Sequence, residues 1–558
     1  MQSLDTHEVL NQFDELTDLH LLQADTALQE VLQRHEAQAF VPALNRFAGE
    51  LGQKTTWELA EQANRHSPEL HRFDARGRAL DAVEFHPSWH QLMALYRQQG
   101  LIALPFDRPD RARWSAWAAG FYLHGQVEQG TLCPATMTTA AIPVLQKEVV
   151  LWNQLQHQLQ SPTYDARDLP LAQKQSIWIG MGMTEKQGGS DVRANTTIAR
   201  PVGAGGRGAE YLLRGHKWFF SAPMCDAHLV VARMATPGGE LGGHACFFVP
   251  RWRPDGSKNP VRIQRLKDKV GNRSNSSSEV ELQDALGILM GEEGRGIPTI
   301  IEMANYTRLN CVLGSAAMLR TATVQTIAYA RQRSAFGKHL ADQPLMRCVL
   351  GDIALESEAA MQLAMHLAQA YELEAEGDLL ARAWKRIMTP AAKFWVCKRA
   401  VEITGEAMEV FGGNGYVQDS IVSRLFREAP VNSIWEGSGN VMCLDVLRAM
   451  GREPEATRLL LQNLIDMAAG EAPLMQLAQS LAQRLSAPPE TLEPQARRLV
   501  QDLALLAQGC LLRKYAPSYM ADGFIATRLG EQNGAMVVGA FNSAALDISA
   551  ILQRALPM

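Results

Sequence analysis

The residue best suited to accept a proton is Glu436, within the run WEGSGN from Trp435 to Asn440. A carboxylate beside an aromatic ring and among small residues can lie in a dry pocket and serve there as a general base. Most glutamates instead lie in solvent or cap helices, so the sequence by itself leaves both alternatives open. Glu436 is therefore a candidate catalytic residue.

A second segment that can do chemistry is the hydroxyl- and glycine-rich run GMTEKQGGSD, from Gly182 to Asp191. Glycines next to hydroxyl side chains let a ligand approach the backbone closely. A flavin requires N–H and O–H donors and an apolar wall, and the run WFFS from Trp218 to Ser221 offers rings and one hydroxyl for such a wall. A polar surface loop and an ordinary aromatic core are the alternatives for these two segments.

Two further patterns point away from phosphate and metal sites. Gly203, Gly205 and Gly208 satisfy G-x-G-x-x-G, but the pattern lies between two β-rich runs and opens no helix, so we expect no Rossmann-type site there. His86 and His90 have the spacing of metal ligands on a helix, yet no third ligand is evident. Capping or packing is favoured for these histidines, and no metal is expected.

Four segments of different character must position the candidate residues. Helical apolar spacing extends from residue 6 to about residue 160, and the proline-bearing run 161–174 ends it. Short β-rich runs with glycine-rich connectors follow, as is typical of antiparallel hairpins, and helical spacing then returns. We therefore predict an N-terminal helical domain (1–175), a β-barrel domain (176–286), a helical bundle (287–450) and a C-terminal helical domain (451–558).

Length, composition and charge exclude several classes of protein. The 558 residues are too many for one small module, and 46% hydrophobic residues can bury a large core. A formal net charge of −5 gives no overall attraction to nucleic acid or anionic lipid. The eight cysteines lie far apart, and no apolar stretch reaches the length of about 18 residues that a membrane span needs. These features predict reduced core thiols, no membrane span and a cytoplasmic location.

Together, these segments resemble the acyl-CoA dehydrogenase family of flavoproteins. The run from Gly182 to Ala194 fits the first signature of that family, and the run from Glu409 to Glu428 fits the second. The resemblance implies a mainly α fold with a central β-domain: a helical domain, a β-barrel or sandwich and a four-helix bundle, here with an extra C-terminal helical domain. Within the family, the runs Gly180–Val192, Arg265–Asn275 and Pro430–Asn440 are similar to a branch associated with the bacterial adaptive response to DNA alkylation.

The resemblance implies that FAD is the cofactor and that three stretches of this sequence hold it. The implied residues are Met181, Gly182, Met183, Thr184, Glu185, Gly188, Gly189 and Ser190; Phe219, Phe220 and Ser221; and Ile434, Trp435, Gly437, Ser438, Gly439 and Asn440. Arg333 and Phe336 resemble residues that reach the FAD of a neighbouring subunit. A homo-oligomer, with a homotetramer as the expected form, follows from the same resemblance.

Glu436 is the base that the resemblance implies. Members of the family place their base either in this motif or on the first long helix after the β-domain, and that helix position is Thr307 here. Glu436 would take an α proton from an acyl thioester while a hydride passes from the β carbon to the flavin. Arg448, twelve residues further on, is a second catalytic candidate, with a helix-surface or ion-pair role as the alternative.

The resemblance to the alkylation-response branch also implies that the C-terminal domain binds duplex DNA. From residue 451 to residue 558 there are nine Lys and Arg residues and ten Asp and Glu residues, which gives a net charge of −1. Phosphate binding needs clustered positive charge, and the candidate patch is Arg497, Arg498, Arg513 and Lys514. Solvated helix faces are the alternative.

Two functions remain as hypotheses. The first is an FAD-containing acyl-CoA dehydrogenase-like protein of the alkylation response, which binds duplex DNA and either has weak isovaleryl-CoA dehydrogenase activity or detoxifies alkylating agents. The alternative is an ordinary metabolic dehydrogenase of short- or branched-chain acyl-CoA that does not bind DNA. A purely structural scaffold fits poorly, because the glycine-rich segment and Glu436 are both present.

Overall fold

The computed structural model describes residues 6–107, 109–235, 239–530, 537–540 and 546–557. The chain divides into two units. The sheet unit comprises Thr55–Cys311 together with Trp435–Val441, and the helical unit comprises Met1–Lys54, Val312–Ile434 and Met442–Met558. The glycine-rich segment, the aromatic run and Glu436 all belong to the sheet unit.

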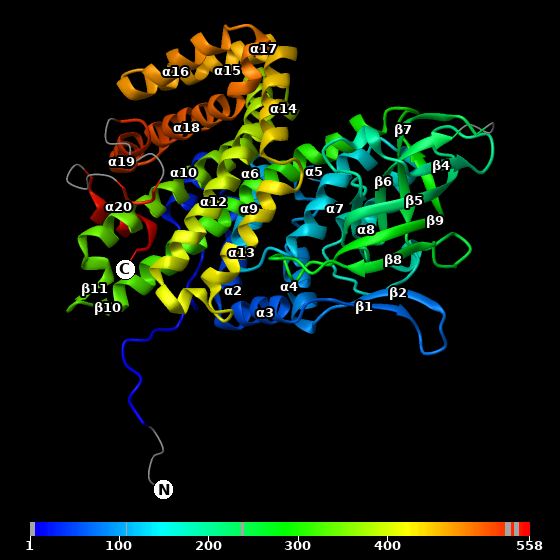
Figure 1. Ribbon diagram of the computed structural model, residues 1–558, viewed down its shortest axis with the longest axis horizontal. Helices are drawn as coiled ribbons and strands as arrows, with labels where there is room; N and C mark the ends of the chain where they lie inside the picture. Colours follow the sequence, from blue (N-terminus) through cyan, green and yellow to red (C-terminus); the bar gives the residue numbers. More distant parts are fainter. Residues whose placement is uncertain (1–5, 108, 236–238, 531–536, 541–545, 558) are drawn as a thin grey trace. The chain divides into compact units, whose positions relative to one another are not determined.

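The sheet unit is built around a seven-stranded β-sheet (Figure 1). Its strands are β3 (Ile179–Gly182), β4 (Ile198–Pro201), β5 (Glu210–Ser221), β6 (Ala227–Ala235), β7 (Leu241–Pro250), β8 (Val261–Leu266) and β9 (Ser277–Met290). The strand order is β3-β6-β4-β5-β9-β7, β8 pairs with β9, and β6 also pairs with β7. The pairing of β6 with β7 closes β6, β4, β5, β9 and β7 into a ring, so the expected barrel or sandwich is a barrel.

Alternating burial explains why these runs form strands. Along β5, Tyr211 and Leu213 are buried while Arg214 is exposed, which is the period of two that a half-buried strand requires. Their side chains join Phe247 of β7 and Val280 of β9 in the barrel core. The apolar positions of the sequence therefore determine which face of each strand points inward.

Two features of the sheet differ from the prediction. β3 and β4 both pair with β6 in parallel, whereas the glycine-rich connectors indicate antiparallel hairpins. Parallel strands are joined by longer connections than the strands of a hairpin. A glycine-rich loop therefore does not determine with which strand the next strand pairs. The β-rich runs expected from the sequence (177–181, 196–199, 211–220, 228–232, 246–249 and 279–282) do not include β8, because its run VRIQRL contains three polar residues.

Helices of the same unit lie along one side of the barrel (Figure 1). They are α3 (Lys54–Arg65), α4 (Pro87–Gln98), α5 (Leu104–Asp107), α6 (Arg113–Val127), α7 (Leu132–Leu145), α8 (Val149–Gln160), the 3₁₀ turns η1 (Leu171–Gln173) and η2 (Val192–Ala194), and the start of α9 (Gly296–Gln332). Nearly every residue of α6 and α7 is buried, as expected of helices that are apolar on all sides. Thr138 joins α7 to the barrel, since its hydroxyl accepts a hydrogen bond from the N–H of Ile179 at 3.0 Å.

A β-hairpin interrupts the N-terminal region, where only helices are expected. β1 (Glu69–Phe73) and β2 (Ala79–Glu84) pair in antiparallel fashion. The carboxylate of Asp81 accepts a hydrogen bond from the N–H of Ile263 at 3.0 Å and so connects the hairpin to β8. The available sequence signal is the turn from Asp74 to Gly77, in which Gly77 has φ +75°.

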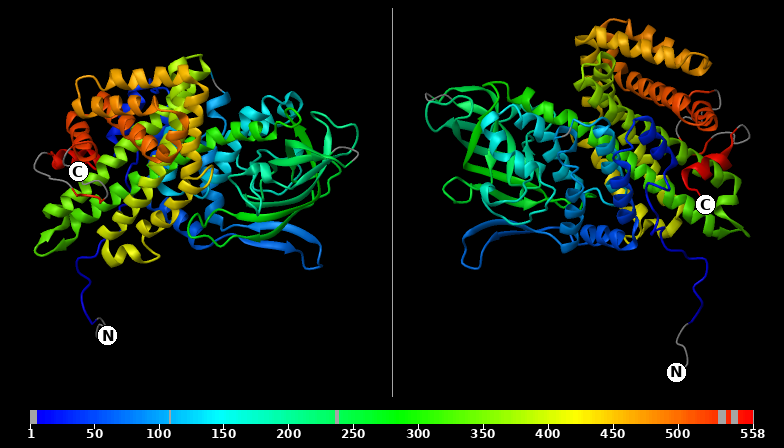
Figure 2. Two further views of the ribbon diagram at one scale, coloured as in Figure 1. Left: turned by 45° about the horizontal axis from the view of Figure 1, so that its top comes forward. Right: turned by 180° about the vertical axis from the view of Figure 1, so that it is seen from behind.

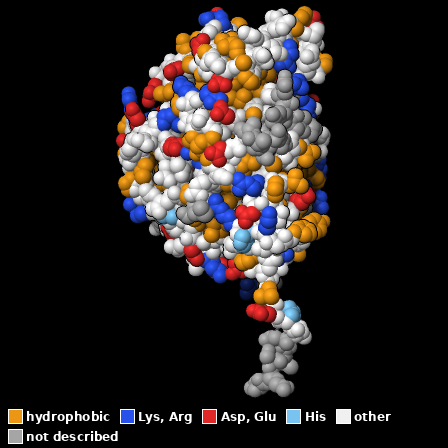
Figure 3. Space-filling model, turned by 90° about the vertical axis from the view of Figure 1, so that its left-hand side faces the viewer, with side chains coloured by type: hydrophobic (Ala, Val, Ile, Leu, Met, Phe, Trp, Pro, Cys, Tyr) orange, Lys and Arg blue, Asp and Glu red, His pale blue; other side chains and the backbone are white. Residues whose placement is uncertain are grey.

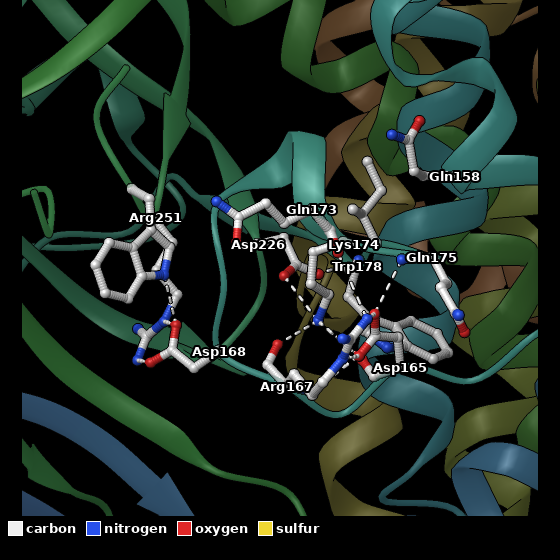
Figure 4. A network of polar contacts seen from close by, with 12 residues as sticks. Gln158, Asp165, Arg167, Asp168, Gln173, Lys174, Gln175, Trp178, Asp226 and Arg251 are labelled. Atoms are coloured by element: carbon white, nitrogen blue, oxygen red, sulfur yellow. Dashed lines mark hydrogen bonds and ion pairs between the residues drawn. The ribbon is translucent and has the colours of Figure 1, made fainter. Parts of the chain in front are cut away.

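Buried charges fix the segment that joins α8 to β3 (Figure 4). The ammonium of Lys174 lies 3.2 Å from Asp226 and donates to the carbonyl of Asp165 at 2.9 Å. Asp226 also accepts a hydrogen bond from the N–H of Trp178 at 2.8 Å. Burial raises the pKa of Asp226 to about 6, although the charge of Lys174 opposes that effect. The segment expected to be a domain boundary is therefore tied to the barrel.

The long helices α10 and α12 contact many of the other helices of the helical unit (Figure 2). Its elements after α9 are β10 (Ser334–Ala335), β11 (Lys338–His339), η3 (Leu340–Asp342), α10 (Pro344–Ala375), α11 (Leu379–Ala383), the π-helical turn η4 (Trp384–Met388), α12 (Thr389–Val410), η5 (Gly412–Tyr416), α13 (Ile421–Ile434), α14 (Gly439–Arg452), α15 (Pro454–Met467), α16 (Ala472–Leu485), α17 (Pro489–Leu492), η6 (Glu493–Gln495), α18 (Ala496–Tyr515), α19 (Ser518–Arg528) and α20 (Ile548–Ala555). Two more, α1 (Thr26–Arg34) and α2 (Val41–Gly52), come from the N-terminal part of the chain.

The C-terminal helices share a core with the bundle. Leu355 of α10, Leu512 of α18, Phe524 of α19 and Ile551 of α20 are buried in one hydrophobic cluster. All eight cysteines of the chain are buried and free of disulfides, as the prediction of core thiols requires. Within the described ranges, every helix is too short or too polar to cross a lipid bilayer.

Candidate functional site

A buried ion pair anchors the glycine loop, which we define as residues 182–195. Glu185 and Lys217 of β5 lie 2.7 Å apart, and both side chains are 0% exposed. The carboxylate of Glu185 also accepts a hydrogen bond from the N–H of Thr196 at 2.7 Å. Burial acts to raise the pKa of Glu185, but the charge of Lys217 and the hydrogen bonds from Lys217, Thr196 and Thr197 together outweigh it and lower that pKa to about 2. Glu185 is therefore ionised at neutral pH and holds the loop on β5.

The glycine loop carries two hydroxyl side chains, Thr184 and Ser190. The carbonyl of Thr184 accepts a hydrogen bond from the N–H of Trp218 at 2.8 Å, which brings the loop beside the aromatic run of β5. In the part of the chain that the structure describes, the hydroxyls of Thr184 and Ser190 have no protein partner. The carboxylate of Glu185, in contrast, is occupied, so this residue acts on the shape of the loop rather than on a ligand.

The glycines of this region have two different roles. Met181 and Gly182 end β3, and a Cβ at Gly182 would lie 2.6 Å from the ring of Phe220, so barrel packing requires glycine there. A Cβ at Gly188 would meet no atom within 4 Å. Met183 and Gly189 lie in the same loop, next to its two hydroxyls. The loop thus leaves open backbone on its outer side.

A β-bulge at Phe219 turns one ring of the aromatic run outward. The register between β5 and β9 shifts between Trp218 and Phe220, and Phe219 has φ +56°. Phe219 is 55% exposed, whereas Phe220 is 1% exposed and its ring stacks on that of His228 with 4.0 Å between centroids. Phe219 can therefore form an apolar wall. The predicted contact of Phe220 with a cofactor is not supported, because its ring belongs to the barrel core.

Ser221, at the end of β5, lies in a polar group with Cys133 and Asn275. Burial raises the pKa of Cys133 to about 12, although hydrogen bonds from Ser221 and Asn275 to the sulfur act against this rise. The negative charge of Glu436 adds to the rise. Cys133, near the start of α7, is therefore a neutral thiol that interacts with Ser221 and feels the charge of Glu436. The sequence does not distinguish Cys133 from the other seven cysteines, so its interaction with Ser221 could not be predicted.

Glu436 is held from the side of α9. It has φ +59° and precedes Gly437 with φ +107°, a left-handed conformation that costs a non-glycine residue about 1 to 3 kcal/mol. Arg308 Nε donates to the carbonyl of Glu436 at 3.2 Å, and Thr307 Oγ1 lies 2.6 Å from Oε2 of Glu436. Thr307 is 1% exposed, whereas Glu436 is half-buried. The carboxylate therefore has a fixed direction and stays accessible.

The residues around Glu436 complete this part of the sheet unit. Trp435, Gly437, Ser438 and Gly439 are half-buried, and Asn440 is exposed in the first turn of α14. A fixed, accessible carboxylate that contacts the hydroxyl of Thr307 is suited to remove a proton from a bound ligand. The histidines at the metal-like spacing do not contribute, since His86 caps α4 and His90 bonds to Tyr164 at 2.6 Å.

Three protein families match consecutive parts of the chain. They are the N-terminal domain of the adaptive response protein AidB (residues 11–166), the middle domain of acyl-CoA dehydrogenase (180–285) and the C-terminal domain of acyl-CoA dehydrogenase (294–451). The AidB protein of Escherichia coli (strain K12), an acyl-CoA dehydrogenase by name, is 45% identical over 531 residues, which cover 95% of each chain. The chain belongs to the AidB branch of the acyl-CoA dehydrogenase family.

Solved structures of acyl-CoA dehydrogenases share the fold. ACDH-11 of Caenorhabditis elegans, in complex with C11-CoA, superposes with a TM-score of 0.83 at 24% identity and covers 99% of this chain and 93% of its own. An acyl-CoA dehydrogenase of Bacillus anthracis, complexed with FAD, gives a TM-score of 0.63 at 16% identity over 97% of this chain and 88% of its own. The mainly α fold with a central β-domain is thereby confirmed.

Some predicted site residues of this acyl-CoA dehydrogenase lie in the helical unit. Phe336 is 99% exposed at the tip of the β10–β11 hairpin and has φ +52°, and Arg333 donates to the carbonyl of Asn11. Arg448 is exposed and lies 3.9 Å from Asp445 on its own helix, as the ion-pair alternative expects. Ile434 ends α13 and is 64% exposed.

The four basic residues predicted to bind DNA do not form one patch. They are Arg497, Arg498, Arg513 and Lys514, all on α18. Sixteen positions separate Arg497 from Arg513, a distance of about 24 Å along a helix. Arg498 pairs with Asp502 at 2.9 Å, and Arg513 pairs with Glu471 at 2.9 Å. On the face shown in Figure 3, Lys and Arg side chains are likewise interspersed with Asp and Glu.

Proposed function

We propose that this chain binds FAD in the sheet unit and oxidises an acyl-CoA thioester with Glu436 as the base. The observation that carries the proposal is the fixed carboxylate of Glu436, which Arg308 and Thr307 hold from α9. Related folds with bound C11-CoA and with FAD support the same two classes of ligand.

The residues of the sheet unit fit a flavin. The hydroxyls of Thr184, Ser190 and Ser438 have no protein partner in the described part of the chain, and the glycine loop adds open backbone. This donor set suits the polar edge and the phosphates of FAD. The half-exposed ring of Phe219 supplies the apolar wall. Glu185 and Lys217 hold the loop in shape, so they support binding without touching the cofactor.

The proposed reaction removes two hydrogens from the acyl chain and leaves a double bond between Cα and Cβ. Bound FAD supplies the acceptor for the hydride that leaves Cβ. Glu436 takes the proton that leaves Cα, and the bond from Arg308 to its main chain keeps the carboxylate in place. The thiol of Cys133 stays protonated because burial raises its pKa to about 12, so no second anion competes with the base.

Glu436→Gln tests the proposal. The variant keeps the shape of the side chain but cannot take a proton, so we expect anaerobic flavin bleaching by isovaleryl-CoA to slow by about 10² to 10⁴-fold while FAD content stays equal. Glu84→Gln is the matched control, because Glu84 is 71% exposed in the same unit, and it should bleach like the wild type. Undiminished bleaching by Glu436→Gln would reject Glu436 as the base.

We further infer a place for this chain in the response to DNA alkylation. The inference is supported by 45% identity to the AidB protein of E. coli over 95% of both chains. Duplex DNA binding by the C-terminal helices and a homotetramer with Arg333 and Phe336 at its contacts belong to the same proposal. Because Arg498 and Arg513 form ion pairs, the proposed DNA binding has no preformed basic patch on α18. An ordinary dehydrogenase of short- or branched-chain acyl-CoA is the alternative.

A further inference from the structure

The hydroxyl of Thr307 has two close oxygen neighbours but only one hydrogen. Its oxygen lies 3.0 Å from the carbonyl oxygen of Ala304 and 2.6 Å from Oε2 of Glu436. A carbonyl oxygen and an ionised carboxylate oxygen can only accept hydrogen bonds. Both contacts are hydrogen bonds at the same time only when Glu436 is protonated and donates to Thr307. When Glu436 is ionised, the single hydrogen of Thr307 has to point to the carboxylate.

We propose that Thr307 is a positioning residue that gives Glu436 a hydrogen-bond partner in both of its protonation states. In the ionised state the hydroxyl of Thr307 donates to Oε2 of Glu436. After Glu436 has taken the α proton, its new O–H donates to Thr307 Oγ1, and the threonine hydrogen turns to the carbonyl of Ala304. No proton moves onto Thr307: its hydrogen bond with Glu436 reverses direction, and its own hydrogen then forms a bond to the carbonyl of Ala304. The proposal rests on the proposed role of Glu436 as the base.

Burial makes this hydroxyl hard to replace by water. Thr307 is 1% exposed and Ala304 is 4% exposed, and a buried polar atom that loses its partner stays unsatisfied. Arg308 binds the main-chain carbonyl of Glu436. The charges of Glu436 and Lys269 both act on the neutral thiol of Cys133. Thr307 thus contacts the carboxylate oxygen itself, whereas Arg308 fixes the backbone.

Because Oε2 keeps a partner, the carboxyl group does not have to rotate when it takes up the proton. A base whose two states share one geometry stays aligned with the Cα–H bond through the reaction. The threonine at this helix position therefore has a function of its own. Thr307 binds the carboxylate of Glu436, and Arg308, the next residue of α9, binds the main-chain carbonyl of Glu436.

Thr307→Val removes the hydroxyl and keeps the shape, whereas Thr307→Ser keeps the hydroxyl. In the holoenzyme we expect Thr307→Val to slow anaerobic flavin bleaching by isovaleryl-CoA about tenfold, the effect of one lost hydrogen bond to a charged group. The KM for the thioester should stay within about twofold, since binding is not affected. The acid limb of the pH profile should move to higher pH, because the ionised carboxylate loses a charge-assisted hydrogen bond. Thr307→Ser should keep the wild-type profile.

Infrared pH-difference spectra of the full-length protein give a readout that does not depend on activity. Spectra of Glu436→Gln, subtracted from those of the wild type, isolate the carboxylate band of Glu436. We expect the midpoint of its titration to lie at higher pH in Thr307→Val than in the wild type and in Thr307→Ser. An unchanged midpoint in Thr307→Val would overturn the proposal. An equal change in Thr307→Ser would also overturn it, because packing of the methyl group would then be the cause.

The two proposals fail in different ways. If the wild type binds FAD but no acyl-CoA bleaches the flavin, the proposed function fails. The infrared titration still shows whether the hydroxyl of Thr307 stabilises the ionised carboxylate of Glu436. If Glu436→Gln abolishes bleaching and Thr307→Val leaves both the pH profile and the titration unchanged, the function stands and the role of Thr307 is rejected.

Discussion

Glu436 and Phe219 both hold a left-handed backbone conformation, with φ +59° and φ +56°. The side chain of Phe219 points out of the barrel into solvent. The side chain of Glu436 points toward Thr307 of α9. Conformations of this kind persist where neighbouring groups fix them, and they are concentrated at functional sites. Arg308 provides such a contact for Glu436, and the ladder between β5 and β9 provides it for Phe219.

The ion pair between Glu185 and Lys217 leads to a prediction for stability. Glu185→Gln leaves the buried ammonium of Lys217 without its counter-charge, so we expect the free energy of unfolding to fall by about 3 kcal/mol. Adding Lys217→Met removes the stranded charge, and the double variant should therefore be more stable than Glu185→Gln. Urea denaturation measures both changes.

Glu61→Gln is the matched control for this prediction. Glu61 and Arg65 form an ion pair on the surface of α3, with side chains 44% and 50% exposed, and such pairs contribute about 0.5 kcal/mol or less. If Glu185→Gln is as mild as Glu61→Gln, or if the double variant is less stable than Glu185→Gln, the glycine loop is not anchored by this pair.

At the scale of elements, the segment between α8 and β3 predicts a pH dependence of stability. Burial raises the pKa of Asp226 in the folded protein to about 6, above the ordinary value of about 3.9. A carboxyl with a raised pKa binds its proton more tightly when folded, so this contribution is present below about pH 4 and is lost as the pH rises to about 6. Between pH 4 and 7, the stability of the wild type relative to Asp226→Asn should therefore fall by about 2 kcal/mol.

Asp168→Asn controls for the general effect of pH. Burial acts to raise the pKa of Asp168, but Arg251 and Lys258 outweigh it and hold the pKa below its usual range. The stability of the wild type relative to Asp168→Asn should thus rise over the acid range as the pH increases. Urea titrations at several pH values compare the variants. A wild-type advantage over Asp226→Asn that grows with pH would contradict the assigned direction.

The types of the elements followed from local patterns, but their pairings did not. The β-rich run 211–220 predicts β5, and the helical spacing of the predicted bundle (287–450) covers α10 and α12. The hairpin β1–β2 was not predicted, because its strands carry several exposed polar residues. The parallel pairing of β3 and β4 with β6 depends on contacts far apart along the chain. Local propensity holds no information about such partners.

At the scale of the whole molecule, the sequence predicted the pieces of the site but not the contacts that hold them. The residue types mark the glycine-rich segment, Phe219 and Glu436 as candidates for the site. The pair of Glu185 with Lys217 joins positions 32 apart, and the contact of Thr307 with Glu436 joins positions 129 apart. Such partners become neighbours only through the closed barrel and the return of the chain at Trp435. The predicted basic patch on α18 is wrong for the same reason. The sequence does not show that Arg498 and Arg513 pair with acidic residues.

Cofactor binding by the purified chain tests the central claim most directly. The full-length protein, mixed with FAD and passed through a desalting column, should keep about one FAD per chain and show flavin absorption bands. Phe219→Gly, which removes the exposed ring, should keep less FAD while the circular dichroism spectrum stays unchanged. Correctly folded wild-type protein that emerges colourless, with no FAD in its extract, would contradict the account.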